Sequence, residues 1–579
     1  MQAPANKASP IILWFRQDLR LADNPALSQA CKDGDIIPVY ILDDQSAGDW
    51  AMGGASRWFL HEALEALDRS LDGKLNLFSG DPLEILQHLV NTHNAQAVYW
   101  NRCYEPWRLK RDTQLKADLK ELDLEVKSFN ASLLWEPWEV LKKDQTPYKV
   151  FTPYYKRGCL SHMPPRRPLP TPENVNLLNK SECSLTLNDL NLKPKINWDS
   201  EISEMWTVDE QTADTYLDVF LEEGIADYRE GRNFPNKAHV SRLSPYLHLG
   251  LLSPNTAWHR AKDQGPIAAN EDNIAVFLSE LGWREFSYYL LYHFPQLPDK
   301  NLQTKFDRFN WSQDNQQNLV AWQTGQTGYP LIDAGMRELY STGYMHNRVR
   351  MVVGSFLVKN LLIHWQEGER WFWDCLLDAD LASNSASWQW VAGANSSKKY
   401  YTNQENINKY TRTNQRNTYL DKSYEEIEAM PSPTALMDTQ KFNLSLHLPE
   451  TSHILFTPGL PTFIYNYYNL DPLWHKDERG NRILLIEPDF FAKYPVSQKC
   501  INFMLALSEH IKDIQIYTGS FQSFTRQYKA TTIYYKEHPL NNGYTGKQED
   551  RDWITSDVVG YYPSFFAYWK KVRKHLKFT

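Results

Sequence analysis

Short apolar runs alternate with amphipathic stretches over the first 135 residues. The runs of strand length are IILWF, IIPVYILDD, NLFSG, AQAVYW and LEVKSFN, and residues 56–71 have helical periodicity. Strands that alternate with helices are typical of a parallel sheet covered by helices. We therefore predict an α/β, Rossmann-like N-terminal domain over residues 1–135. The segment FRQDLRLADNPAL follows the first run, where such folds bind ligands, although no GxGxxG motif supports a dinucleotide site.

The pattern changes twice over the next 300 residues. Residues 136–204 include a long stretch rich in Pro, Asn and Lys, which indicates an extended interdomain linker. Its early segment TPYKVFTPYYKR is interpreted as a structural clasp. Residues 205–430 have helical periodicity and almost no strand signals, so we predict an all-α domain there.

The last part of the chain returns to an α/β pattern. HILF, RILLIEP, IQIYTG and TTIYYKEHP are typical of strands, and residues 496–511 indicate a helix between two of them. We predict an additional α/β module over residues 440–579, similar to the first domain and packed on the helical one. The end of the chain, PSFFAYWKKVRKHLKF, predicts a basic, aromatic helix.

Composition narrows the class of protein. The chain has 579 residues, 42% of them hydrophobic, and a net charge of −8, so any nucleic-acid site must be a local basic patch. Its six cysteines are scattered without a CxxC pair, which predicts reduced thiols and no metal site. The N-terminal MQAPANKASP has no apolar signal core, and no apolar run approaches membrane-spanning length. We expect a soluble, cytoplasmic monomer that does not contact membranes.

An unusual polar stripe lies in the sequence LLDADLASNSASWQWVAGAN. Asp380, Asn384 and Trp388 are spaced by four, so in a helix they share one face. An acid, an amide and an indole together can hydrogen-bond a polar heterocycle and place a ring beside it. Upstream, HNRVRMVVGSFLVKNLLIHW predicts one helix whose Arg350 could neutralise Asp378. The alternative is a buried ion pair in a helical core, with the indole as packing.

Two further motifs carry candidate chemistry. In HVSRLSPYLHLG, Ser244-Pro245 predicts an N-cap followed by a proline, as does Ser253-Pro254 further on. Hydroxyls and an arginine at a helix N-terminus can hold a diphosphate. FLSELGWREF places Glu280, Trp283 and Arg284 on one helix face, where an acid and an indole suit a flat polar ligand. The alternative is a surface Glu–Arg pair.

These motifs, in this order, resemble the photolyase/cryptochrome family. The resemblance rests on LWFRQDLRLADNPAL, SRLSPYLHLGLLSP, FLSELGWREF, TGYPLIDAGMREL, GYMHNRVRMVVGSFLVKNLLIHWQEGERWF and DADLASNSASWQWVAG, over roughly residues 10–400. It is strongest to class I DNA photolyases that repair cyclobutane pyrimidine dimers. The resemblance implies an antenna domain, a helical FAD-binding domain, UV-damaged DNA as partner, and association with the nucleoid when bound to DNA. Methenyltetrahydrofolate, a deazaflavin or no antenna are all left open.

The resemblance also implies roles for individual residues. The expected FAD contacts are Tyr228, Ser241, Arg242, Leu243, Ser244, Arg284, Asn347, Arg350, Asp378, Asp380 and Asn384. The expected dimer contacts are Glu280, Trp283, Asn347 and Met351, and the expected electron-transfer chain is Trp388, Trp365 and Trp311. The expected antenna contacts are Asn101, Tyr104 and Glu105, and the expected DNA contacts are Arg348, Lys398 and Lys399. The basic helix at the end of the chain is a further candidate DNA contact, through Lys570, Lys571, Arg573, Lys574 and Lys577.

Several positions separate the members of this family. The pair His346-Asn347 stands where the (6-4) branch typically has two histidines, which favours the cyclobutane lesion. Asn384 stands where an Asp would indicate a plant-cryptochrome-like sensor. Val240 and Tyr344 replace a usual Thr and a frequent Trp, and a polar sequence after Gly393 replaces a YFRIFNP-like segment. A blue-light sensor without repair activity, and repair of (6-4) or single-stranded lesions, therefore remain alternatives.

Overall fold

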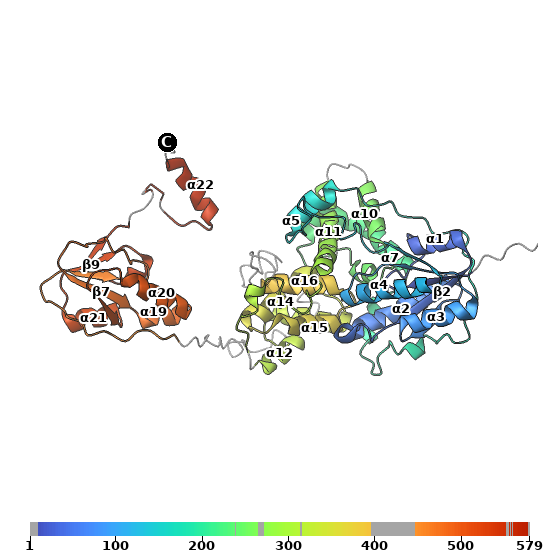
Figure 1. The fold of residues 1–579 in the computed structure, drawn as a ribbon, viewed down its shortest axis with the longest axis horizontal. Helices are drawn as coiled ribbons and strands as arrows, with labels where there is room; N and C mark the ends of the chain where they lie inside the picture. Colours follow the sequence, from blue (N-terminus) through green and yellow to red (C-terminus); the bar gives the residue numbers. More distant parts are fainter. Residues whose placement is uncertain are drawn as a thin grey trace, which may run out of the picture. The chain divides into compact units, whose positions relative to one another are not determined.

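The computed structural model describes residues 10–237, 239–264, 271–312, 315–394, 446–551, 555, 557–558 and 560–576. The chain forms two compact units, residues 1–439 and residues 440–579 (Figure 1). Within the described residues, no helix is both long and apolar enough to cross a membrane, and no cluster of metal-binding side chains occurs. All six cysteines are free thiols.

Unit 1 opens with the predicted parallel sheet. Its strands are β1 (Ile11–Phe15), β2 (Ile36–Leu42), β3 (Asn76–Ser79), β4 (Ala97–Asn101) and β5 (Glu125–Phe129), in the order β3-β2-β1-β4-β5. The helices between them are α1 (Pro25–Asp33), α2 (Gly54–Ser70), α3 (Pro82–His93) and α4 (Pro106–Glu121). Side chains of β1 alternate between two separate apolar cores, because successive residues of a strand point to opposite faces.

The rest of unit 1 is helical, and the described residues of 205–394 contain no strand. The helices are α5 (Phe151–Pro153), α6 (Ser200–Met205), α7 (Glu210–Val219), α8 (Tyr228–Gly231), α9 (Ser244–His248), α10 (Pro254–Asp263), α11 (Glu271–His293), α12 (Gln316–Gln323), α13 (Pro330–Thr342), α14 (Asn347–Ser355), α15 (Trp365–Cys375) and α16 (Leu381–Ala392). Helix α16 packs against α11, α14 and α15, and α15 also packs against α2. The helical part therefore lies directly against the α/β part, as Figure 1 shows for α15 and α2.

Two helix boundaries differ from the prediction. The stretch expected to be one helix runs from Asn347 to a π-helical turn at Phe356–Asn360 and ends there, because Leu362 takes a left-handed φ of 55°. Apolar residues keep their helical spacing across this break, so the sequence pattern does not reveal where the helix ends. Ser244 is the first residue of α9 and not its cap, whereas Ser253 does cap α10 by accepting the N–H of Asn255 at 3.1 Å.

The connector between the two parts of unit 1 is attached along its length. Leu178 and Leu185 donate backbone N–H groups to Ile36 and Leu77 of the sheet, at 2.9 and 2.8 Å. Earlier in the connector, the Tyr155 ring packs so closely on Gly282 of α11 that a Cβ at Gly282 would clash with it. The clasp interpretation of this segment therefore matches the contacts that it makes.

Unit 2 repeats the strand order of the first sheet. Its strands are β6 (Thr462–Tyr465), β7 (Asn481–Ile486), β8 (Ile514–Thr518), β9 (Ile533–Lys536) and β10 (Lys547–Glu549), in the order β10-β9-β6-β7-β8. Counted along the chain, both sheets have their strands in the order third, second, first, fourth, fifth, and all pairs are parallel. Its helices are α19 (Pro488–Lys493), α20 (Gln498–Ser508), α21 (Phe521–Tyr528) and α22 (Phe565–His575).

The prediction of a strand at HILF is wrong. These residues run beside β8, but the Ser452 side chain accepts the N–H of Ile516, and the Gln515 side chain accepts the N–H of Leu455. Side chains thus replace the backbone groups that a ladder needs. The first strand of the sheet is instead the TFIY segment of β6, and the sequence pattern gives no sign of β10 either.

Candidate functional site

Asp380 forms the N-cap of α16 and lies in a buried polar cluster. Its side chain accepts the N–H of Ser383 at 2.6 Å and the hydroxyl proton of Tyr288. Burial opposes ionisation of Asp380, but nearby His248, Arg284 and the Tyr288 hydroxyl outweigh it and hold its pKa at about 2. The acid at the start of the predicted stripe is therefore a buried carboxylate at a helix N-terminus.

Arg350 of α14 and Asp378 form a two-pronged ion pair. The two guanidinium nitrogens lie 3.0 and 2.9 Å from the two carboxylate oxygens, as the charges in the sequence suggested. The Arg350 guanidinium also lies 5.5 Å from the centre of the Tyr344 ring, and Arg242 lies 5.1 Å from the same ring. Tyr344 thus brings the SRLS segment next to the Asp378 pair.

The SRLS segment carries two hydroxyl groups that make no hydrogen bond to the described residues. Arg242 takes a left-handed φ of 53°, and the Ser244 side chain is exposed. Within the described residues, the hydroxyls of Ser241 and Ser244 have no hydrogen-bond partner. Leu243 is buried beneath them.

Asn384 continues the stripe inside α16. Its amide nitrogen donates to the backbone carbonyl of Glu369 in α15 at 3.0 Å, while the Ser385 hydroxyl donates to the Glu369 carboxylate. The other carboxylate oxygen of Glu369 is buried without a partner among the described residues. Burial raises the pKa of Glu369 to about 8, so a proton is held beside Asn384 at neutral pH.

Glu280 of α11 is held by a residue that the sequence analysis did not single out. The Glu280 carboxylate pairs with Arg232, which directly follows α8, and the Arg232 guanidinium lies 5.5 Å from the centre of the buried Tyr228 ring. The Glu280 side chain remains 31% exposed, so one face of its carboxylate is accessible. The only local signal for Arg232 is its i, i+4 spacing from Tyr228.

Helix α14 carries the other two expected dimer contacts; we call its first turns the α14 wall, and the surface of α11 around Glu280 and Trp283 the Glu280 wall. Asn347 is the exposed first residue of α14 and Met351 is partly buried one turn on. Arg348 donates to the side-chain amide oxygen of Asn233 at 2.9 and 2.7 Å, and to the Met351 sulfur at 3.4 Å. Because Asn233 follows Arg232 directly, this short segment joins the Glu280 wall to the α14 wall.

Trp283 stacks on a ring from the connector. The Phe151 ring lies 3.7 Å from the Trp283 ring at an interplanar angle of 11°, and Tyr155 stacks on Phe151 at 5.4 Å. The indole nevertheless stays 40% exposed. Arg284, the next residue, is directed away into the domain contact and donates to the Ser132 carbonyl at 2.7 Å.

The three tryptophans of the predicted chain share one apolar core. Trp388 and Trp365 are buried within it and Trp311 packs at its edge. His364 stacks on Trp365 at 5.7 Å and meets Trp311 edge-on at 5.1 Å. Trp388 also meets Trp322 at 6.1 Å, a contact that the sequence did not suggest.

The three predicted antenna residues lie in different surroundings. Asn101 is buried and bonds to Asn24 and to the N–H of Ala26. The buried Tyr104 hydroxyl donates to Glu136 at 2.8 Å. These two side chains make buried hydrogen bonds within the fold, and Glu105 lines a cavity.

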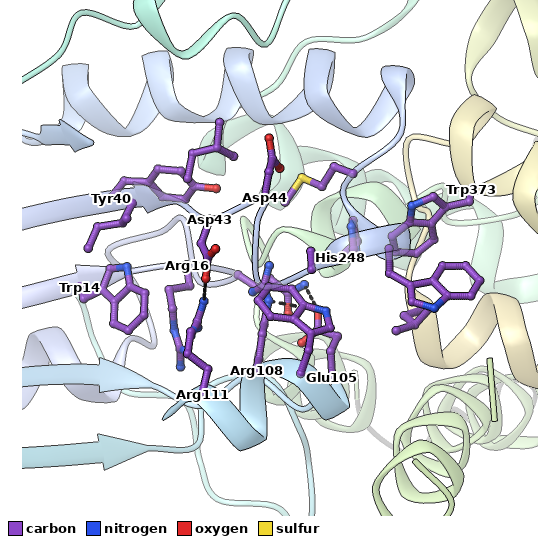
Figure 2. A pocket seen from close by; sticks show the side chains of 18 residues that line it. Trp14, Arg16, Tyr40, Asp43, Asp44, Glu105, Arg108, Arg111, His248 and Trp373 are labelled. Atoms are coloured by element: carbon purple, nitrogen blue, oxygen red, sulfur yellow. Dashed lines mark hydrogen bonds and ion pairs between the residues drawn. The ribbon is translucent and has the colours of Figure 1, made fainter. Parts of the chain in front are cut away.

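That cavity opens at the carboxyl ends of β1, β2 and β4, beside the point where the strand order reverses (Figure 2). Its polar and aromatic lining includes Arg16, Gln17, Asp43, Glu105, Trp107 and Arg108. The FRQDLR segment therefore contributes Arg16 and Gln17 to the lining of this cavity. His248 lines the same cavity, and its Nδ1 lies 3.9 Å from the Asp380 carboxylate.

Two expected DNA contacts, Lys398 and Lys399, lie outside the described residues. Arg348, the third, is tied to Asn233 beside the α14 wall. The residues that sequence reasoning missed are those that hold others in place: Arg232, Asn233, Tyr288, His248 and Glu369.

Comparison with known proteins agrees with this architecture. A family model described as DNA photolyase matches residues 11–173, and one described as the FAD binding domain of DNA photolyase matches residues 277–449. The deoxyribodipyrimidine photo-lyase of Agrobacterium fabrum is 45% identical over 393 residues, which cover 67% of this chain and 81% of that protein. Cryptochrome-1 of Arabidopsis thaliana is 36% identical, over 66% of this chain and 57% of its own.

Solved structures give the same result. A bacterial class III photolyase from Agrobacterium tumefaciens aligns with a TM-score of 0.68 at 40% identity, covering 76% of this chain and 90% of its own. A Synechocystis cryptochrome aligns with a TM-score of 0.66 at 28% identity, covering 75% and 92%. The fold and the site thus define a flavoprotein of the photolyase type. The chain belongs to the photolyase/cryptochrome family, and its likeness to a class III structure means that the relationship does not single out class I.

The residues present fit FAD. Among the described residues, the hydroxyls of Ser241 and Ser244 are without a partner and suit a diphosphate, and the Arg350–Asp378 pair and Asn384 add polar groups inside the helical domain. These residues would hold the cofactor, whose domain the family match identifies.

Proposed function

We propose that this protein is a light-driven DNA repair lyase that splits cyclobutane pyrimidine dimers with the help of FAD. The observation that carries the proposal is that one short segment, Arg232-Asn233, connects Glu280 on α11 with α14, the helix of Asn347 and Met351. Polar and aromatic groups of the two walls remain accessible. A carboxylate and an amide can hydrogen-bond base edges while an indole stacks on them.

The roles of the side chains follow from their contacts. A dimer must leave the duplex to enter such a site. Photolyases are among the enzymes that flip their target bases out of the helix. Arg232 fixes the Glu280 carboxylate by an ion pair, so that its exposed oxygen accepts N–H groups of the dimer. Phe151 covers one face of Trp283 and leaves the exposed part of the indole to stack on the lesion.

When bound, FAD would supply the light-driven one-electron chemistry that ring splitting needs, and the protein would hold the cofactor and the dimer in place. Asn384 supplies an amide beside the cofactor. Since its nitrogen is engaged by the Glu369 carbonyl, its oxygen is the end left to accept a hydrogen bond. An amide there cannot act as an acid, which suits a cofactor that must stay reduced.

We further propose that the Glu105 cavity holds an antenna chromophore, either a folate or a deazaflavin. A solved archaeal photolyase from Sulfolobus tokodaii, similar to this chain with a TM-score of 0.61 at 28% identity, contains two FAD molecules, with the implication of a novel light-harvesting cofactor. The support in this chain is the position of the cavity at the strand switch point and its link through His248 to Asp380.

The direct test follows thymine absorbance in an oligonucleotide with one defined cyclobutane thymine dimer. Photoreduced protein should restore the absorbance under blue light and not in the dark. Glu280→Ala should slow recovery by at least about tenfold, since a hydrogen bond to a buried polar edge contributes over 1 kcal/mol. The matched control is Glu222→Ala, an exposed acid elsewhere in the helical part.

The alternative function is a cryptochrome-like light sensor, which the similarity to plant cryptochrome-1 favours. A protein that binds FAD and photoreduces it but repairs neither a cyclobutane nor a (6-4) dimer, in single or double strands, would support the sensor. Running the four substrates side by side also separates the lesion and strand alternatives.

A further inference from the structure

The positive charge of unit 2 is concentrated in its last helix. Residues 440–579 contain 17 Lys and Arg against 13 Asp and Glu, whereas residues 1–439 contain 45 against 57. Five of those 17 lie between residues 570 and 577, and no acid occurs from residue 558 to the end of the chain. Without this short stretch, unit 2 would carry no net positive charge.

Helix α22 has two different faces. Phe565, Trp569 and Val572 are spaced i, i+4 and i+7; the first two rings stack at 6.0 Å and Val572 is 1% exposed. Phe566, Lys570 and Arg573 have the same spacing on another face, and all three are exposed, Phe566 at 78%. Of the first stripe, Val572 is buried whereas Phe565 is 64% exposed, so the helix presents basic side chains together with aromatic rings to solvent.

The described contacts of α22 are with the segment just before it. His575 lies 3.7 Å from Asp557, Tyr568 meets Tyr562 at 5.5 Å, and the Lys571 ammonium lies 5.3 Å from the Tyr562 ring. Within the described residues, Lys570, Arg573 and Lys574 have no acidic partner. Three cations on an exposed face are left for an external anion.

DNA is the anion that matches this surface, and here the inference rests on the proposed function. A duplex carries one negative charge about every 1.7 Å along its axis, so a short row of cations meets several phosphates. Residues 1–439 carry more acidic than basic side chains, so they repel DNA everywhere except at a local basic site. A basic helix on the same chain offsets that repulsion and adds a second point of attachment.

We propose that the exposed basic face of α22 binds the phosphate backbone of DNA outside the lesion site. Lys570, Lys571, Arg573 and Lys574 make the contacts, and Phe566 lies beside them against the sugar and base edges. The contact is independent of sequence, since phosphates position a protein without reading bases. It raises the affinity for long DNA and leaves the lesion chemistry to the helical domain.

The test is the salt dependence of binding by the full-length protein to a duplex that contains one thymine dimer. In one variant, Lys570, Lys571, Arg573 and Lys574 are all replaced by Gln. In the control variant, the exposed Lys476, Lys493, Lys499 and Lys512 of the same unit are replaced by Gln, which changes the net charge equally. Because each phosphate contact adds about 0.9 to the slope of log K against log salt, the α22 variant should lose about 2 to 4 from that slope.

An unchanged slope, or an equal loss in the control variant, overturns the proposal. Vesicles with anionic lipids provide a further arm: loss of vesicle binding in the α22 variant with an unchanged DNA slope would assign the helix to a membrane surface instead. Light-dependent dimer splitting is measured in parallel at saturating enzyme. If the dimer is split normally and the salt slope is the same in the α22 variant, only this inference fails. If the dimer is not split but the salt slope falls in the α22 variant, only the proposed repair function fails.

Discussion

The indole of Trp388 packs directly on Gly368 of the neighbouring helix. A Cβ added to Gly368 would overlap the Trp388 ring and would lie 2.7 Å from Leu357. Glycine is therefore required at this position by the close approach of α15 and α16, and the glycine fixes where the first ring of the proposed electron-transfer chain lies.

Gly368→Ala should displace Trp388 and slow photoreduction of the bound flavin. Overpacking of a core of this kind costs about 1–3 kcal/mol of unfolding free energy. The control is Gly354→Ala, whose Cβ would lie 3.3 Å from Val391 and 3.5 Å from the Trp388 ring, a contact that small shifts can absorb. Photoreduction is followed by flavin absorbance and stability by thermal unfolding. Equal photoreduction rates in both variants would show that the position of the indole does not matter.

Replacing Trp388, Trp365 or Trp311 with Phe should separate photoreduction from repair. Each ring is proposed to pass an electron to an oxidised flavin, and none of them belongs to the walls around Glu280. Photoreduction should slow by at least about tenfold, which corresponds to a barrier higher by about 1.4 kcal/mol.

Repair by the chemically reduced variants should stay at the level of the unmodified protein. Trp258→Phe serves as the control, because Trp258 is a buried tryptophan in a different core, packed edge-on against Trp135 at 5.4 Å. A variant that loses repair even after chemical reduction would place its tryptophan in the substrate site.

Arg350→Ala should weaken retention of FAD and destabilise the helical domain. Asp378 has a 6% exposed side chain and would be left without its cation, and breaking such a buried pair costs about 3–5 kcal/mol. Arg229→Ala removes an exposed pair with Asp272 and should cost no more than about 1 kcal/mol. Flavin content after purification and denaturant unfolding provide the two readouts. Similar losses in both variants would contradict the role given to Arg350.

Glu369 should make stability depend on pH. Burial raises its pKa to about 8 in the folded chain, against an ordinary 4.5 when unfolded. The folded state therefore binds the extra proton, so this stabilisation is complete below about pH 4.5 and disappears as pH rises through about 8. Glu369→Gln keeps the acceptor for Ser385 and cannot ionise. The advantage of the unmodified protein over this variant in thermal unfolding should shrink between pH 5 and pH 8, and a constant difference would exclude the effect.

Asn101 and Glu105 should respond differently to substitution. Asn101→Ala removes buried hydrogen bonds to Asn24 and Ala26 and should destabilise the α/β domain by about 1–3 kcal/mol. Glu105→Gln changes only a cavity wall and should mainly alter the uptake of a folate or deazaflavin, read from the absorbance of the reconstituted protein. A stable Asn101→Ala protein that fails to take up the antenna would support Asn101 as one of the antenna contacts predicted from the sequence.

The sequence alone determined most of the classes of secondary structure and supplied the candidate ligand-facing residues, which stay predictions. Period-two and period-3.6 patterns report burial along a single element, and burial is what selects strands such as IILWF and helices such as α11. The pairing of Arg350 with Asp378 could also be predicted from the sequence, because a buried acid needs a cation and few cationic residues lie close enough in the chain. The motifs around Asn384 identify the family without reference to any contact.

Tertiary structure alone decided which side chains hold the site together. Arg232 meets Glu280 across 48 residues and Tyr288 meets Asp380 across 92, and local periodicity carries no information about pairs so far apart. The same reason explains the failed prediction at HILF, where hydrogen bonds through the side chains of Ser452 and of Gln515 on the distant strand β8 take the place of the ladder. Strand order, too, depends on packing between elements, so the repetition of the first sheet by the second appeared only in three dimensions.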